Sequence, residues 1–172
     1  MAKNLILYYS RKGENYWNGS IRNLPKGNTE IVAEFIQKAV GGDLFEIETV
    51  KSYIKDHMKM IYEAKEELEK GIRPELKNYP DISGYDTIFL GFPNWWDTLP
   101  MPVVGFLEHY DWSGKRIIPF VTSGGSGFGR SIADLQKICA GAIIEKGGGA
   151  FLGHEVETSE AGISAWAKSV LG

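Results

Sequence analysis

Three short segments of the chain hold the residues whose types and spacing suit ligand chemistry. The first begins at Ser10 and ends at Gly27-Asn28-Thr29, so it offers hydroxyl and amide donors beside glycines that let a backbone come close. A helix that begins after Asn28, with Asn28 as its N-cap, would also favour an anion through its dipole. The segment therefore suits a phosphate cradle, and an ordinary helix cap after a long surface loop is the alternative.

The second segment covers residues 91–102 and places Trp95 next to Trp96, with Pro93 before them and Pro100 after them. Neighbouring side chains of an extended segment point in different directions, so both rings cannot lie in the core. A planar aromatic ligand that stacks on the outward ring would gain about 0.5–1.5 kcal/mol beyond burial. A hydrophobic lid that packs on a neighbouring helix is the alternative interpretation.

The third segment, residues 122–131, has four glycines within six residues and can present backbone N–H groups to a flat ring or an anion. Its spacing also resembles a phosphate loop, Gly124-x4-Gly129-Arg130-Ser131. Arg130 replaces the lysine of that motif, and no acidic strand end follows to hold Mg²⁺, which argues against a nucleotide hydrolase. The first strand is not followed by G-x-G-x-x-G, which argues against an NAD-binding Rossmann domain.

These segments need a scaffold that brings them to one edge. Apolar runs predict strands within residues 5–9, 43–50, 87–92, 116–121 and 142–152. Helical spacing of apolar residues predicts helices over residues 29–40, 56–70, 101–109, 129–139 and 160–171. Because right-handed crossovers place a helix after each strand, the alternation predicts a doubly wound α/β fold with a five-stranded parallel sheet. Ligands bind such sheets at the carboxyl ends of the strands, where all three segments begin.

Composition excludes several classes of function. A chain of 172 residues fits one domain, residues 1–172. Nineteen basic residues against 22 acidic ones give a net charge of −3, so the composition lacks the excess of positive charge that favours nucleic-acid binding. A single cysteine excludes an internal disulfide. With one cysteine and three histidines scattered along the chain, the sequence does not indicate a metal centre. The first apolar run is too short for a signal peptide and no window suits a membrane span, so we expect a cytoplasmic protein.

Taken in this order, the three segments resemble the flavodoxin family, and more narrowly the bacterial flavodoxin-like FMN proteins that carry a Pro-x-Trp-Trp segment. The resemblance covers essentially the whole chain. The first loop of flavodoxins reads approximately Ser/Thr-x-Thr-Gly-Asn-Thr, whereas here Ser10-Arg11-Lys12-Gly13 is separated from Asn28-Thr29 by an insertion from Glu14 to about Gly27. The resemblance implies a flavodoxin-like sheet with strand order 2-1-3-4-5 and FMN as the cofactor.

The resemblance also implies three sets of FMN-binding residues. They are Ser10, Arg11, Lys12, Asn28 and Thr29 at the phosphate; Pro93, Asn94, Trp95, Trp96, Asp97 and Thr98 in the second loop, with one tryptophan against the flavin ring; and Ser123, Gly124, Gly125, Ser126 and Gly127 along the other edge of the ring. Related sequences often have glycine where this chain has Asp97. In flavodoxins a peptide of this loop flips on one-electron reduction, so we expect the one-electron-reduced flavin to be less stabilised here.

The function implied by the resemblance is that of an FMN electron-transfer protein that meets redox partner proteins transiently. It requires no catalytic acid or base, because the chemistry belongs to the cofactor. An FMN-dependent NAD(P)H:quinone or azo-compound reductase is the alternative, and an adaptor domain without flavin is a third hypothesis. Tyr16 and Trp17 in the insertion either shield the flavin, contact a partner or belong to a swivelling surface loop.

Overall fold

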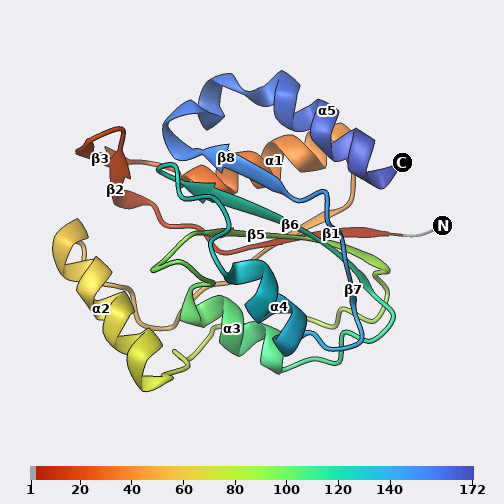
Figure 1. Ribbon diagram of the computed structural model, residues 1–172, viewed down its shortest axis with the longest axis horizontal. Helices are drawn as coiled ribbons and strands as arrows, with labels where there is room; N and C mark the ends of the chain where they lie inside the picture. The colour runs from red at the N-terminus through yellow and green to blue at the C-terminus, as the bar shows by residue number, and fades with distance from the viewer. Residues whose placement is uncertain (1–2) are drawn as a thin grey trace.

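The computed structural model describes residues 3–172, so the first two residues of the predicted domain 1–172 lie outside the described range. A parallel sheet runs through the molecule in the order β4-β1-β5-β6-β7, and β8 also pairs with β6 (Figure 1). Its strands are β1 (Asn4–Tyr8), β4 (Asp43–Glu46), β5 (Thr87–Pro93), β6 (Arg116–Ser123), β7 (Ile143–Ile144) and β8 (Gly149–Leu152). The predicted doubly wound fold with its 2-1-3-4-5 order is therefore confirmed, with β7 and β8 together in the fifth position.

The fifth strand is divided because of a proline in its neighbour. The N–H of Glu145 donates to the carbonyl of Ile117 at 2.8 Å, so the backbone of Ile117 faces the fifth strand. Pro119, two residues further on, faces the same side and has no N–H to offer. β7 pairs with β6 before this point and β8 pairs with it afterwards, from Phe120.

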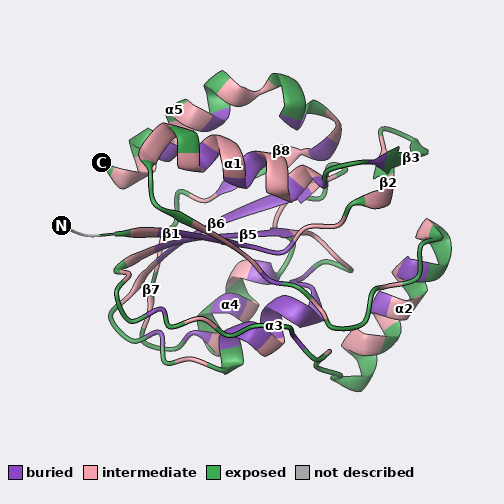
Figure 2. Ribbon diagram, turned by 180° about the vertical axis from the view of Figure 1, so that it is seen from behind, coloured by how far each residue is buried: buried purple, intermediate pink, exposed green. Residues whose placement is uncertain are grey.

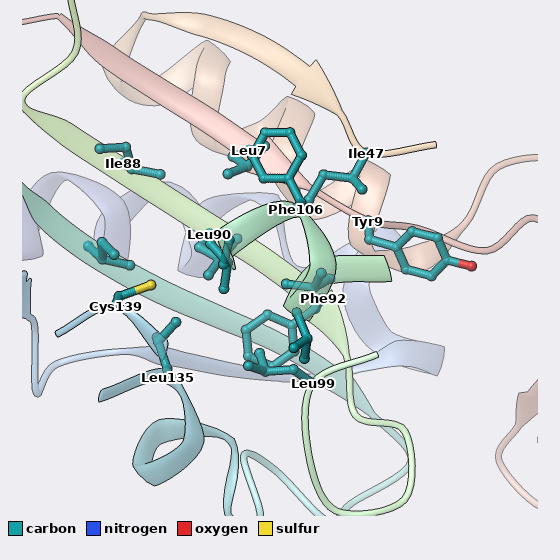
Figure 3. Packing of buried hydrophobic residues seen from close by; sticks show 14 of the residues in the cluster. Leu7, Tyr9, Ile47, Ile88, Leu90, Phe92, Leu99, Phe106, Leu135 and Cys139 are labelled. Atoms are coloured by element: carbon teal, nitrogen blue, oxygen red, sulfur yellow. The ribbon is translucent and has the colours of Figure 1, made fainter. Parts of the chain in front are cut away.

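Helices cover both faces of the sheet. α1 (Asn28–Val40), the 3₁₀ turn η1 (Gly153–Thr158) and α5 (Glu160–Leu171) lie on one face, and α3 (Met101–Glu108) and α4 (Ser131–Ile138) lie on the other (Figure 1). The central strands are buried between these layers (Figure 2). Leu7, Leu90 and Phe106 belong to the core on the α3 side (Figure 3), and Ile6, Ile36 and Ile163 to the core on the α1 side.

One predicted helix does not cover a sheet face. α2 (His57–Lys70) lies beside the carboxyl ends of the strands, next to an antiparallel hairpin of β2 (Gly13–Trp17) and β3 (Ser20–Leu24) (Figure 1). The hairpin accounts for most of the insertion that was expected to be a loop. Asn18 and Gly19 both have positive φ, 45° and 93°, which is the geometry of a two-residue type I′ turn.

Several predicted boundaries need correction. α1 begins at Asn28, with Gly27 rather than Asn28 at the N-cap position, because the carbonyl of Gly27 accepts the N–H of Ile31 at 3.2 Å. The strand predicted over residues 43–50 ends at Glu46, and α4 is shorter than the predicted 129–139 at both ends. Within residues 3–172, no helix combines the length and the apolar character that crossing a membrane requires.

Candidate functional site

A cavity of about 280 Å³ opens at the carboxyl ends of the central strands. This volume is close to the lower end of the roughly 300–1,000 Å³ common for small-molecule sites. The second and third segments, the start of α1, the hairpin and α2 all contribute to its wall. The lining residues are Asn15, Tyr16, Asn28, His57, Met60, Ile61, Ala64, Pro93, Asn94, Trp95, Trp96, Thr122, Ser123, Gly124, Gly153 and His154.

The tryptophan segment forms a tight turn in the wall of the cavity. The backbones of Trp95 and Thr98 exchange two hydrogen bonds of 3.2 Å, and the central residues Trp96 and Asp97 have φ of 53° and 71°. Two consecutive positive φ values define a type I′ turn, which favours Asn and Gly. A bulky tryptophan at positive φ is an outlier, so surrounding contacts must hold it.

The two tryptophan rings take different directions, as predicted for neighbours in an extended segment. Trp95 packs against the core and meets the rings of Tyr9 and Tyr53 edge-on at 5.3 and 5.2 Å. Burial raises the pKa of both tyrosines above its ordinary value, so ionisation of the rings around Trp95 is disfavoured further. The Tyr53 hydroxyl in turn donates to Glu67 of α2 at 2.5 Å.

Trp96 lies on the rim, 38% exposed. Its indole Nε1 donates to the carbonyl of Ile61 in α2 at 2.6 Å. The ammonium of Lys65 lies 5.1 Å from the centre of the ring, on its face. These two contacts hold the tryptophan turn, residues 95–98, against α2.

Asn94 joins the glycine segment, residues 122–131, to the tryptophan segment, residues 91–102, by hydrogen bonds. The Asn94 amide nitrogen donates to the carbonyl of Gly127 at 2.8 Å and to the Ser126 hydroxyl at 3.0 Å. Because a carbonyl can only accept, the amide nitrogen must face Gly127 and the amide oxygen must face the other way. Ser123 accepts the N–H groups of Gly125 and Gly127 at 3.2 and 3.0 Å, so its hydroxyl closes the loop on itself.

The residues predicted at the phosphate are divided between two cavities. Asn28 lines the cavity, but Thr29 is buried beside it and its hydroxyl pairs with that of Thr122 at 2.8 Å. Ser10, Arg11 and Lys12 line a separate cavity of about 740 Å³, and the Ser10 hydroxyl also accepts the N–H of Glu30 in the first turn of α1. The structure therefore brings two members of the predicted phosphate set, Asn28 and Thr29, to the glycine segment, whose first residue is Thr122.

The remaining predicted residues lie near the cavity without all facing it. Pro93, Asn94, Trp95 and Trp96 line it, as do Ser123 and Gly124. Thr98 is buried, and its hydroxyl bonds to the carboxylate of Asp134 in α4. The carbonyl of Asp97 accepts the N–H of Arg130 at 2.8 Å, which ties the turn to the start of α4.

Three buried polar side-chain atoms around the cavity have no hydrogen-bond partner among the residues that the structure describes. They are Oδ1 of Asn28, Oδ1 of Asn94 and Nδ1 of His57, contributed by the first residues of α1, the second segment and the start of α2. An unpaired buried polar atom costs about 1–3 kcal/mol, so buried polar atoms are normally satisfied. The two amide oxygens can only accept hydrogen bonds, so their presence in one cavity indicates a ligand that supplies donors.

A comparison with known protein families identifies the family of this chain. The family model described as Flavodoxin matches residues 24–170. The chain belongs to the flavodoxin family. Among curated proteins, no relative matches it.

Solved structures agree with this flavodoxin assignment. A flavoprotein of Bacteroides eggerthii is 29% identical, with a TM-score of 0.74 over 100% of this chain and 99% of its own. A flavoprotein of Bacteroides uniformis is also 29% identical, with a TM-score of 0.74 and coverage of 97% and 98%. A Lactobacillus acidophilus flavoprotein in complex with FMN is 22% identical, with a TM-score of 0.64 and coverage of 92% and 98%, and this likeness shows the fold alone.

Thr122 of β6 also lines the cavity of this flavodoxin, although it was not among the predicted binding residues. Further wall residues lie outside the predicted sets, and one of them, Tyr16, is a residue whose role at the flavin the sequence left open. They are Asn15 and Tyr16 of the hairpin, His57, Met60, Ile61 and Ala64 of α2, and Gly153 and His154 of η1. Burial lowers the pKa of His57 below its usual value, which favours the neutral imidazole. The only sequence signal for the hairpin was Asn18-Gly19 between aromatic and apolar residues. No local pattern places α2 beside the strand ends.

Proposed function

We propose that this flavodoxin binds FMN in the cavity and acts as an electron-transfer protein. The observation that carries the proposal is the set of three unpaired polar atoms around one cavity, Asn28 Oδ1, Asn94 Oδ1 and His57 Nδ1, of which the two amide oxygens are hydrogen-bond acceptors. FMN carries an N–H on its ring and hydroxyl groups on its chain, so it offers the donors that these acceptors lack. The donor set of the ligand and the acceptor set of the protein fit.

The apolar part of the wall suits a flat ring. Trp95 is fixed edge-on by two tyrosines, while Met60, Ile61 and Ala64 come from α2. These side chains exclude water and offer aromatic and aliphatic surface to a planar ligand. The first turn of α1, where Asn28 lies, provides the favourable end of a helix dipole for a phosphate.

The residues around the cavity have different roles in the proposed mechanism. Bound FMN would supply the redox chemistry, taking up and releasing electrons. Asn94 would accept a hydrogen bond from the ligand while its amide nitrogen holds the glycine segment in place. Trp95 would orient the ring, and the neutral His57 would form a further hydrogen bond at Nδ1. None of these residues has to transfer a proton.

The Lactobacillus acidophilus relative supports the choice of FMN, because its structure holds FMN on the same fold. We further propose that electrons pass to and from partner proteins that bind transiently in the cytoplasm. The half-exposed Trp96 on the rim would lie close to such a partner.

Flavin binding tests the proposal directly. The purified chain, titrated with FMN and followed by flavin fluorescence, should bind FMN and turn yellow. Asn28→Ala removes one unpaired acceptor and should weaken binding about tenfold, the equivalent of about 1.4 kcal/mol. Asn23→Ala is the matched control, because Asn23 lines the other cavity and its loss should leave FMN affinity unchanged.

Two outcomes would change the assignment. A chain that binds no FMN excludes both a carrier and an FMN-dependent reductase. Rapid bleaching of the bound flavin by NADH or NADPH without oxygen would replace the carrier by a reductase, whereas a carrier should stay oxidised on that timescale.

A further inference from the structure

The β2–β3 hairpin forms part of the cavity wall, although the insertion that encodes it interrupts the first loop. Asn15 and Tyr16 of β2 both line the cavity. The Tyr16 ring also lies against the glycine segment, since a Cβ on Gly124 would come within 2.7 Å of Tyr16 Cε1. The hairpin therefore reaches the third segment at the cavity, and a side chain at position 124 would displace the tyrosine.

Contacts within the protein fix the base of the hairpin. The Arg11 guanidinium donates to the carbonyls of Glu14, Ile54 and Lys55 at 3.0–3.1 Å. The carboxylate of Glu14 accepts the backbone N–H of His57 at 3.3 Å, which joins β2 to the start of α2. Arg11 thus holds the hairpin against the segment that leads into α2, and Tyr16 is positioned without any ligand.

The two aromatic residues of β2 point to opposite sides, as alternation along a strand requires. Trp17 is covered by the guanidinium of Arg22, 4.6 Å from the centre of its ring. Tyr16 is 49% exposed, although it contacts Gly124 and lines the cavity. A half-exposed ring in a cavity wall is a surface that a flat ligand would cover.

We propose that Tyr16 is a flavin-binding residue of this chain and that the hairpin encloses the bound cofactor. The inference rests on the proposed function, because the ligand in question is FMN. It gives the insertion a role in binding: the hairpin supplies an aromatic wall in addition to Trp95 and Trp96 and limits the access of solutes to the flavin.

The test compares two substitutions on the same hairpin. Tyr16→Leu should weaken FMN binding about three- to tenfold and should make the bound flavin more accessible to quenching by iodide ion. Tyr16→Phe should keep both values, because it retains the ring whose carbons lie against Gly124 and removes only the hydroxyl. Ile21→Ala is the control: Ile21 pairs with Tyr16 across the hairpin and is exposed, but it does not line the cavity.

The outcomes separate this inference from the proposed function. If the wild-type chain binds FMN and Tyr16→Leu matches it in affinity and in iodide quenching, the role of the hairpin is wrong and the flavin site stands. If the wild-type chain does not bind FMN, both proposals fail. Circular dichroism of the apoprotein checks that Tyr16→Leu folds, and Gly124→Ala, which should displace the same ring, gives a second variant with the same expected rise in iodide quenching.

Discussion

Two tight turns of this molecule share one backbone geometry and reach it by different means. The hairpin turn has Asn18 and Gly19 at φ of 45° and 93°, and the tryptophan turn has Trp96 and Asp97 at 53° and 71°. Asn and Gly are the residues that such a turn prefers. Tryptophan and aspartate are not, and positive φ costs a residue such as tryptophan of the order of 1–3 kcal/mol.

The two turns also differ in how many neighbouring groups they contact. Open space surrounds Gly19, in which an added Cβ would meet no atom within 4 Å. Trp96 is bonded to α2 through Ile61, and Asp97 is bonded to Arg130 at the start of α4. The hairpin turn is therefore specified by its own residues, whereas the tryptophan turn is imposed by tertiary contacts. Imposed strain of this kind is common at functional sites.

The largest expected effect comes from the contact beneath the tryptophan turn. Gly129 has φ of 55°, and a Cβ there would lie 2.6 Å from the backbone oxygen of Asp97. Gly129→Ala should lower the free energy of unfolding by about 2–4 kcal/mol, because it combines backbone strain with a steric conflict that the turn must absorb. Urea denaturation of the apoprotein measures this loss.

The matched substitution in the hairpin turn is Gly19→Ala. It imposes a comparable positive φ but meets no neighbouring atom, so it should cost only about 1 kcal/mol. Equal losses for Gly129→Ala and Gly19→Ala would contradict the view that tertiary contacts impose the tryptophan turn.

A smaller effect is expected from removing one of those contacts. Trp96→Phe deletes the indole N–H that bonds to Ile61 and keeps an aromatic ring at the cavity. It should destabilise the protein by about 1 kcal/mol and should also weaken FMN binding, because the turn loses its attachment to α2. Thermal unfolding and FMN titration measure the two effects.

Trp166→Phe is the control for that substitution. Trp166 also donates its indole N–H to a carbonyl, that of Gly147 at 2.8 Å, but it lies far along the chain on α5 and does not line the cavity. It should lose similar stability with no change in FMN affinity. A similar drop in FMN affinity for both variants would mean that the Trp96 contact has no special role at the site.

The difference between structure specified by local residues and structure imposed by tertiary contacts also explains what the sequence could predict. Apolar runs such as Leu5–Leu7 and the helical spacing in α1 are local patterns, and they predicted the parallel sheet and the two-sided helix cover. The strand order was implied by the resemblance to flavodoxins and not by these patterns. The hairpin turn was also locally encoded, and Asn18-Gly19 between Tyr16 and Ile21 was a signal that went unused.

Features that depend on distant contacts could not be predicted in this way. Arg11 was expected at a phosphate, but its guanidinium bonds to backbone carbonyls of residues 43 and 44 positions away. His57 carried no pattern, and it reaches the cavity only because α2 lies beside the strand ends. The positive φ of Trp96 runs against local preference and follows from contacts with α2 and α4.

The smallest expected effect is a gain. Asp97→Gly removes a side chain at φ of 71° and should raise the free energy of unfolding by less than about 1 kcal/mol, since relief of strain is partly offset by the greater freedom of glycine in the unfolded chain. Asn18→Gly should bring no gain, because asparagine already suits its turn. A redox titration should also show more one-electron-reduced flavin in Asp97→Gly than in the wild type. An equal or smaller amount would show that Asp97 does not resist a change of backbone conformation at this turn.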